Sequence, residues 1–109
     1  MYVSITGLRL HHPLKAPRFW WHAVRAMAQA QADPGCRQVD ARKIDGVHHT
    51  RSLWESEAAM RAYLTRGAHL RAMKQFRRIA TGGTIGFEAD ALPDWEACRR
   101  IWEDQARQY

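Results

Sequence analysis

Two residues on one expected strand have side chains suited to acid–base chemistry. Residues Val47–Trp54 alternate as a strand does, so His49 and Arg51 share one face with apolar neighbours. Histidine moves protons near neutral pH, and a guanidinium holds a carboxylate, enolate or phenolate oxygen. The pattern predicts that His49 transfers a proton and that Arg51 steadies an oxyanion. The structural alternative is an ion pair between Arg51 and Asp40 across a hairpin.

A third candidate, His69, follows the helix breaker Gly67 at the expected start of a helix. In that place the imidazole can serve as a base, as a haem ligand or as a capping contact. The sequence leaves these three roles open. We include His69 with His49 and Arg51 in the predicted catalytic set.

The histidines are numerous enough to raise the question of a metal site. Neutral imidazoles suit zinc, copper or iron, but neighbouring strand residues point to opposite faces, so at most one of each adjacent pair can serve a given site. No carboxylate or cysteine has matching spacing. We predict no metal site and keep a three-histidine site as the alternative. The six histidines are His11, His12, His22, His48, His49 and His69.

Aromatic side chains supply the candidate ligand-binding surface. Most of the five tryptophans are expected in the core or in subunit contacts. Trp20 and Trp21 are consecutive on an expected helix, so they cannot both face the same way. The predicted ligand-binding residues are Trp20, Trp21, His22, Trp54 and Tyr63.

Several other kinds of chemistry lack support in the sequence. We find neither a phosphate-binding loop nor a dinucleotide-binding glycine pattern, and no Ser-His-Asp set follows from the spacing. The net charge is +6, but the basic residues are scattered along the chain, which indicates solubility with some attraction for anions. We therefore predict no nucleic-acid partner. No apolar run is long enough to span a membrane, so we predict no membrane partner either.

The 109 residues fit one domain, predicted to span 1–109. Two cysteines are too few for a disulfide framework, and the N-terminus reads as a strand rather than a signal peptide. These features predict a cytoplasmic protein.

The hydrophobic periodicity predicts the element order βαββααβα. Asp45-Gly46 is a strong hairpin signal, Ser56 is a predicted helix N-cap, and Gly82-Gly83 is expected to stop the third helix. Gly7 marks either a bulge or a strand buried on both faces. The predicted strands are Tyr2–Leu10, Cys36–Ile44, Val47–Trp54 and Thr84–Asp90, and the predicted helices are Pro17–Ala32, Glu57–Arg66, Ala68–Ala80 and one that begins near Trp95.

This order predicts a ferredoxin-like α+β fold, an antiparallel four-stranded sheet with helices on one face. The first and third strands carry apolar residues on both sides, so the other face of the sheet also needs a cover. In so short a chain, a second copy of the same sheet is the simplest cover. We therefore predict a homodimer in which the two sheets pack together.

Two adjoining stretches resemble a known superfamily. Trp54–Tyr63 (WESEAAMRAY) followed by Gly67–Met73 (GAHLRAM) resembles the dimeric α+β barrel proteins, above all their antibiotic-biosynthesis-monooxygenase-like and spheroidene-monooxygenase-like branches. There, a strand that ends in Trp leads into a Ser-Glu-capped helix, and a histidine follows a small residue at the next helix. The resemblance implies a pocket between sheet and helices. It argues against haem degradation of the family's type, because Met73 occupies the place of the histidine used there.

The resemblance, taken with these candidate residues, implies a monooxygenase-like enzyme that acts, without a cofactor, on a small aromatic or polycyclic molecule. Deprotonation of such a substrate gives an electron-rich anion that reacts with oxygen directly. The alternatives are a protein that binds haem or another hydrophobic ligand through His69, and a dimeric domain without catalytic activity.

Overall fold

The computed structural model describes residues 1–108, and for residues 107 and 108 it describes the backbone alone. In chain order the elements are β1 (Tyr2–Leu10), the short 3-10 helix η1 (Pro13–Lys15), α1 (Ala16–Ala32), β2 (Cys36–Ile44), β3 (Val47–Trp54), α2 (Glu57–Leu64), α3 (Gly67–Ile79), β4 (Ala80–Glu88), α4 (Trp95–Gln105) and β5 (Arg107–Gln108).

The strands form one antiparallel sheet in the order β2-β3-β1-β4-β5. Strand β1 lies in the middle and pairs with β3 on one side and β4 on the other. The predicted ferredoxin-like α+β fold with four long strands is confirmed, and the two-residue strand β5 adds to it at the β4 edge. The first three strands have the predicted bounds.

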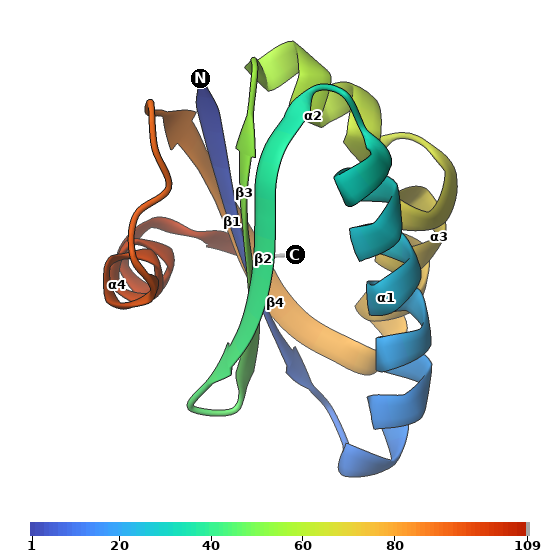
Figure 1. The fold of residues 1–109 in the computed structure, drawn as a ribbon. Coiled ribbons are helices and arrows are strands. Elements are labelled where there is room, and N and C mark those ends of the chain that lie inside the picture. Colours follow the sequence, from blue (N-terminus) through green and yellow to red (C-terminus); the bar gives the residue numbers. More distant parts are fainter. Residues whose placement is uncertain (109) are drawn as a thin grey trace.

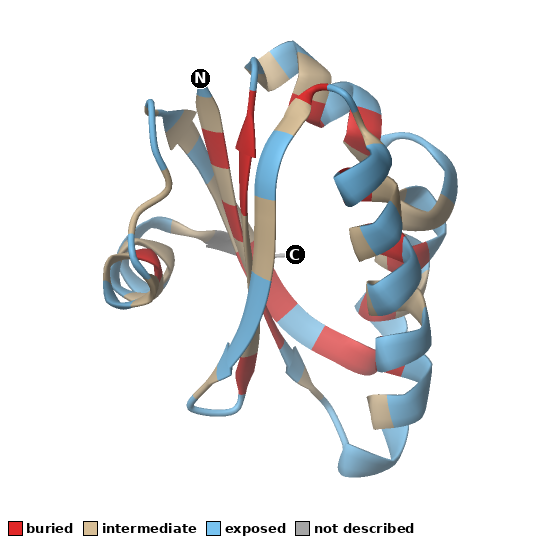
Figure 2. Ribbon diagram, in the orientation of Figure 1, coloured by how far each residue is buried: buried red, intermediate tan, exposed pale blue. Residues whose placement is uncertain are grey.

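The helices do not all lie on one face, and the prediction is corrected on this point. Figure 1 shows α1, α2 and α3 on one side of the sheet and α4 on the other. Helix α4 buries Cys98 against Val3, Ile5 and Leu53, and its Trp102 packs on the same cluster. The chain itself therefore covers part of the face that was expected to need a second copy. The red positions along β1 and β3 in Figure 2 mark how deeply the central strands are buried.

Local signals explain most element boundaries. The side chain of Ser56 accepts a hydrogen bond from the backbone N–H of Ala59 at 3.1 Å and begins α2. The hairpin turn between β2 and β3 has Asp45 and Gly46 at φ 49° and 79°, the left-handed geometry of a two-residue turn. Gly67, at φ 54°, separates α2 from α3 in the same way.

The prediction that Gly82-Gly83 separates the third helix from the last strand is wrong. Helix α3 ends at Ile79, and β4 begins at once with Ala80. Both glycines lie inside β4, where a Cβ on Gly82 would collide with the carbonyl oxygen of Gly7. The close approach of two backbones explains the missing side chain.

Gly7 itself lies in unbroken register with both neighbouring strands, so β1 has no bulge there. A side chain at Gly7 would collide with the indole ring of Trp102. The strand is instead covered on both faces, which was the second of the two interpretations of this glycine.

Candidate active site

A cavity of about 920 Å³ lies between the sheet and helices α1 to α3. Small-molecule sites have volumes of roughly 300–1,000 Å³, so this one can accept a ligand of several fused rings. The alternation of strand residues places even-numbered positions of β1 and β3 in its floor. The cavity reaches the surface between α1 and the edge strand β2, where the exposed Val24 and Lys43 line it.

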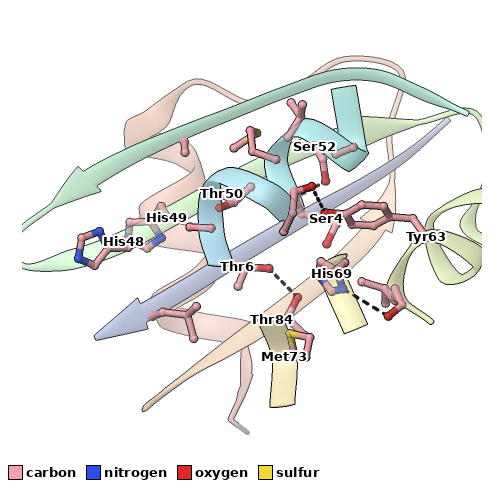
Figure 3. Close-up of a pocket in the computed structure, with 18 of the residues that line it drawn as sticks. Ser4, Thr6, His48, His49, Thr50, Ser52, Tyr63, His69, Met73 and Thr84 are labelled. Atoms are coloured by element: carbon pink, nitrogen blue, oxygen red, sulfur yellow. Dashed lines mark hydrogen bonds between the residues drawn. The ribbon is translucent and has the colours of Figure 1, made fainter. Parts of the chain in front are cut away.

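The floor of the cavity carries a group of hydroxyls (Figure 3), those of Ser4, Thr6, Thr50, Ser52 and Thr84. The Thr84 hydroxyl donates to the carbonyl oxygen of Ile5 at 3.2 Å. The hydroxyl oxygens of Thr6 and Thr84 are 3.3 Å apart. Among the side chains of residues 1–106 and the described backbone, the Thr50 hydroxyl has no hydrogen-bond partner. It is therefore ready to bind an oxygen atom of a ligand.

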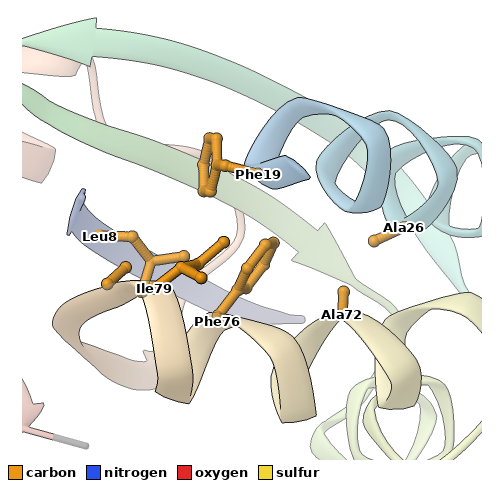
Figure 4. Close-up of a cluster of buried hydrophobic side chains, with 7 residues drawn as sticks. Leu8, Phe19, Ala26, Ala72, Phe76 and Ile79 are labelled. Carbon is orange, nitrogen blue, oxygen red and sulfur yellow. The ribbon is translucent and has the colours of Figure 1, made fainter. Parts of the chain in front are cut away.

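Apolar side chains form the walls. Figure 4 shows the buried cluster in which Phe19 of α1 faces Phe76 of α3, with ring centroids 5.1 Å apart. The same cluster includes Leu8 and Ile79 and closes the cavity at the end where α3 joins β4. Met60, Leu64 and Met73 line the cavity from α2 and α3. An apolar enclosure around a few polar groups is the usual design of a small-molecule site.

His69 lines the cavity from the first turn of α3 and contacts the ring of Tyr63, with centroids 4.5 Å apart (Figure 3). Its Nδ1 lies 3.3 Å from the carbonyl oxygen of Leu64, which can only accept a hydrogen bond. The neutral ring therefore carries its proton on Nδ1 and keeps a lone pair on Nε2. Burial lowers the pKa of His69 below its ordinary value of 6.5, and the hydrogen bond to Leu64 opposes this shift.

A side chain of α1 fixes the start of α3. The backbone N–H of His69 donates to Oε1 of Gln29 at 2.8 Å, while Nε2 of Gln29 donates to the carbonyl oxygen of Arg66 at 3.0 Å. One amide thus satisfies backbone groups on both sides of the turn between α2 and α3. These two hydrogen bonds attach the backbone of His69 and of Arg66 to α1.

Tyr63 and Trp54, both predicted to bind ligand, line the same cavity. Their rings are 5.0 Å apart, and the Tyr63 hydroxyl donates to the carbonyl oxygen of Ala26 at 2.8 Å. Burial is the main cause that raises the pKa of Tyr63, so its hydroxyl stays protonated. Trp54 is almost fully buried and donates from Nε1 to the Ser52 hydroxyl at 2.8 Å. Both rings serve as rigid walls.

His49 borders the cavity through its place in β3, but its ring lies on the opposite face of the sheet. There it packs edge-on against Trp102 of α4, with centroids 5.0 Å apart. Burial lowers the pKa of His49, and a backbone hydrogen bond with Thr6 opposes this shift. The structure therefore does not bring the His49 ring together with His69.

Arg51 also lies on the α4 face. Its Nη1 donates to the carbonyl oxygen of Pro93 at 2.6 Å, its Nη2 contacts Asp40 at 3.2 Å, and its guanidinium lies 4.4 Å from the centre of the Trp95 ring. The ion pair with Asp40 was the structural alternative considered for this residue. These contacts attach the segment before α4 to the sheet, and they place Arg51 outside the cavity.

We expect the Arg51→Met substitution to lower the free energy of unfolding by about 2 kcal/mol, because it removes charged hydrogen bonds from a side chain that is 16% exposed. Urea denaturation followed by circular dichroism measures the change. The matched control is Arg37→Met, whose ion pair with Glu55 is half exposed, and there we expect a loss below about 1 kcal/mol. Equal losses in the two variants would contradict the structural role of Arg51.

The other three predicted ligand-binding residues lie on α1, and only one of them lines the cavity. Trp20 lines the cavity and is 48% exposed, while Trp21 points away from it and is 64% exposed beneath the guanidinium of Arg25. His22 does not line the cavity. Burial lowers the pKa of His22, and Arg18, Arg25 and Arg71 lower it further. Of this pair of tryptophans, Trp20 is thus the one that contributes to the site.

One cavity residue, His48, is missing from the predicted set. Its ring contacts Phe19 at 4.5 Å and Trp20 at 5.4 Å between centroids. Its alternation with Thr50, Ser52 and Trp54 was visible in the sequence. Nothing there showed which face of β3 looks into the cavity, because buried apolar residues lie on both faces.

Among residues 1–108 no three histidine, cysteine or acidic side chains come together as metal ligands do, so the three-histidine alternative finds no geometric basis. In the same part of the chain no helix is both long enough and apolar enough to cross a bilayer.

No family model matches the sequence, and no curated protein matches it. Solved structures do match in three dimensions. SnoaB from Streptomyces nogalater, described as a cofactor-independent oxygenase, has 17% sequence identity and a TM-score of 0.69, over 85% of this chain and 96% of that one. A protein described as an antibiotic biosynthesis monooxygenase has 14% identity and a TM-score of 0.71, over 85% of this chain and 100% of that one.

A protein from Mycobacterium tuberculosis matches with 13% identity and a TM-score of 0.73, over 86% of this chain and 100% of that one. At such identities the likeness concerns the fold. The chain has the fold of the antibiotic-biosynthesis-monooxygenase-like α+β barrel proteins, which confirms the resemblance seen in its sequence.

Proposed function

We propose that this protein is a monooxygenase-like enzyme that oxidises an aromatic or polycyclic small molecule without a bound cofactor. The observation that carries the proposal is the neutral His69 imidazole in the wall of a large, mostly apolar cavity. The fold of SnoaB, a protein described as a cofactor-independent oxygenase, supports the same reaction class.

The first step is removal of an acidic proton from the substrate. Because Nδ1 of His69 donates to Leu64, Nε2 has the lone pair that accepts this proton. The Thr50 hydroxyl on the floor then donates a hydrogen bond to the substrate oxygen on which negative charge develops. Phe19, Trp20 and Tyr63 hold the rings of the substrate in place.

Dioxygen is the oxidant in the second step. The carbanion transfers electrons to oxygen, a new C–O bond forms, and the proton on His69 completes a hydroperoxide. Loss of water from the hydroperoxide leaves a carbonyl group. A CH₂ group and O₂ thereby become C=O and H₂O, with the substrate as the source of all four electrons.

Haem binding is the second candidate function. A histidine whose Nδ1 donates to a backbone carbonyl presents Nε2 as a ligand, and metal-bound histidines commonly donate their other ring N–H in this way. Haem bound at His69 would supply iron chemistry in place of direct oxygen attack. The two candidates differ in their absorption spectra.

The proposed enzyme acts in the cytoplasm as a homodimer. The free thiols of Cys36 and Cys98 suit a reducing compartment, and the resemblance to dimeric barrels favours two subunits. Every side chain used in the proposed reaction comes from one chain.

Oxygen uptake tests the proposal. With anthrone as the probe, we expect purified protein to raise oxygen consumption above the uncatalysed rate and to form anthraquinone with one atom from ¹⁸O₂. A purified protein without a Soret band that also leaves the Soret band of added haem unchanged would exclude the haem candidate. Absence of oxygen uptake with anthrone and related acidic polycycles, together with a haem-dependent Soret band lost in His69→Ala, would overturn the oxygenase proposal.

A further inference from the structure

A second hollow, of about 360 Å³, adjoins the end of the cavity near the β2–β3 hairpin. It shares the side chains of Trp20, Lys43 and His48 with the large cavity. Figure 3 shows His48 at the far end of the cavity from Tyr63. We call this hollow the vestibule. Its lining consists of Arg9, Leu10, Pro13, Ala16, Trp20, Lys43, Gly46 and His48.

The vestibule has a positive charge that the protein does not neutralise. Arg9 and Lys43 both line it, and no acidic residue does. Among the described side chains, those of residues 1–106, neither cation has an ion-pair partner. Arg9 donates only to the backbone carbonyl of Asp45, at 3.4 Å.

The carboxylate in the adjoining hairpin turn is already paired with another residue. The Asp45 carboxylate contacts Nη1 of Arg99 at 2.9 Å, and Arg99 also binds Glu96. The negative charge in the hairpin turn therefore does not cancel the charges of Arg9 and Lys43. A pair of free cations at an apolar cavity is a site that favours an anion.

His48 adds a neutral donor to this group. It lies opposite Lys43 in the β2–β3 register, and its ring packs against Trp20. Burial, Lys43 and His49 together lower its pKa, so the ring stays neutral and can donate one hydrogen bond. The vestibule thus combines two cations and one neutral donor beside an aromatic wall.

We propose that the substrate of this protein is an aromatic anion whose rings fill the cavity and whose carboxylate or similar group binds Arg9, Lys43 and His48 in the vestibule. The inference rests on the proposed function for the chemistry, whereas the binding itself needs only the cavity. It narrows the substrate class from any polycyclic molecule to an acidic one. It also fixes the direction in which the molecule lies, with the charged end at the hairpin and the rings towards His69.

Two dyes with the same aromatic skeleton test this proposal without catalysis. 1-Anilinonaphthalene-8-sulfonate carries a sulfonate, and N-phenyl-1-naphthylamine lacks it. We expect both to bind the protein and to displace each other, with the sulfonate dye bound more tightly. We also expect added salt to weaken only the sulfonate dye.

The Arg9→Gln/Lys43→Gln double variant should weaken the sulfonate dye about fivefold and change the neutral dye less than about twofold. The matched control is Arg77→Gln/Lys74→Gln, which removes the same charge from exposed positions of α3 outside both hollows. This control should leave both dyes unchanged. Thermal unfolding confirms that each variant is folded.

Four outcomes would overturn the inference. If the Arg9→Gln/Lys43→Gln variant weakens the binding of both dyes equally, the cavity itself is damaged. If the control variant weakens the sulfonate dye as much as the Arg9→Gln/Lys43→Gln variant does, the attraction comes from the overall charge and not from the vestibule. A neutral dye that binds as tightly as the sulfonate dye would overturn the anion site and leave the oxygenase proposal standing. Failure of both dyes to bind would overturn the cavity and the proposed function with it.

Discussion

The His69→Asn variant is expected to lower kcat for oxygen-dependent turnover by about 10²–10⁴-fold, the usual contribution of a general base. The asparagine amide can replace Nδ1 as the donor to the Leu64 carbonyl, so the structural contact is kept. The lone pair of Nε2 is lost, together with the contact between the imidazole and the Tyr63 ring. Comparison of kcat and stability in the same variant therefore separates catalysis from folding.

The pH profile gives a second measurement on the same residue. A general base acts when neutral, so kcat/KM of the wild type should rise with pH through the pKa of His69. Burial lowers that pKa, so the rise should be half complete below pH 6.5, the ordinary value for histidine. His69→Asn should lack this inflection.

The matched control is His22→Asn, which removes a histidine that does not line the cavity. Its kcat and its pH profile should equal those of the wild type. A wild-type profile without an inflection below pH 6.5, or full activity in His69→Asn, would remove His69 from the mechanism. The oxygenase proposal would then need a different proton acceptor among the cavity residues.

Signals within a few residues of one another made most of the fold predictable. Ser56 and Asp94 each bind a backbone N–H three residues ahead, and Asp45-Gly46 takes up the turn that its residue types favour. These features depend only on neighbouring atoms. The start of β4 was not predictable in this way. Gly82 lies inside the strand because the backbone of the distant Gly7 leaves no room for a side chain there, and no neighbouring residue signals that contact.

The position of α4 could not be read from its own pattern. Trp95, Cys98 and Trp102 form one apolar stripe, which shows that the helix buries a face but not which surface it covers. In the structure that surface is the far side of the sheet, where Gly7 leaves space for Trp102. The prediction that a second subunit covers this face was made without this information, and it stays a prediction.

The same ambiguity decided which site residues were predicted. Strand β3 is buried on both faces, with Leu53 on one and Trp54 on the other. The alternation separated His48 from His49 but could not show which of them faces the cavity. His69 was found because its place after Gly67 is a local signal, and the lining hydroxyls were missed because serine and threonine in a strand carry no chemical signature.

The Trp54→Ala substitution is the second change for which we expect a large effect. It should lower the free energy of unfolding by about 3–5 kcal/mol. The side chain is 1% exposed, packs on Tyr63 and donates to Ser52, so its removal leaves a hole and deletes a buried hydrogen bond. Trp21→Ala deletes the same atoms from a side chain that is 64% exposed. There the change should stay within about 0.5 kcal/mol. Chemical denaturation of both variants makes the comparison.

Trp54→Phe then separates the two roles of this side chain. Phenylalanine keeps most of the packing against Tyr63 and loses only the Nε1–H donor to Ser52, so the expected cost is about 1–2 kcal/mol. Since Trp54 also lines the cavity, affinity for N-phenyl-1-naphthylamine in this folded variant reports its contact with ligand. Unchanged affinity would assign Trp54 to the core alone. A Trp54→Ala protein as stable as the wild type would contradict the packing of α2 on β3 that places His69 at the cavity.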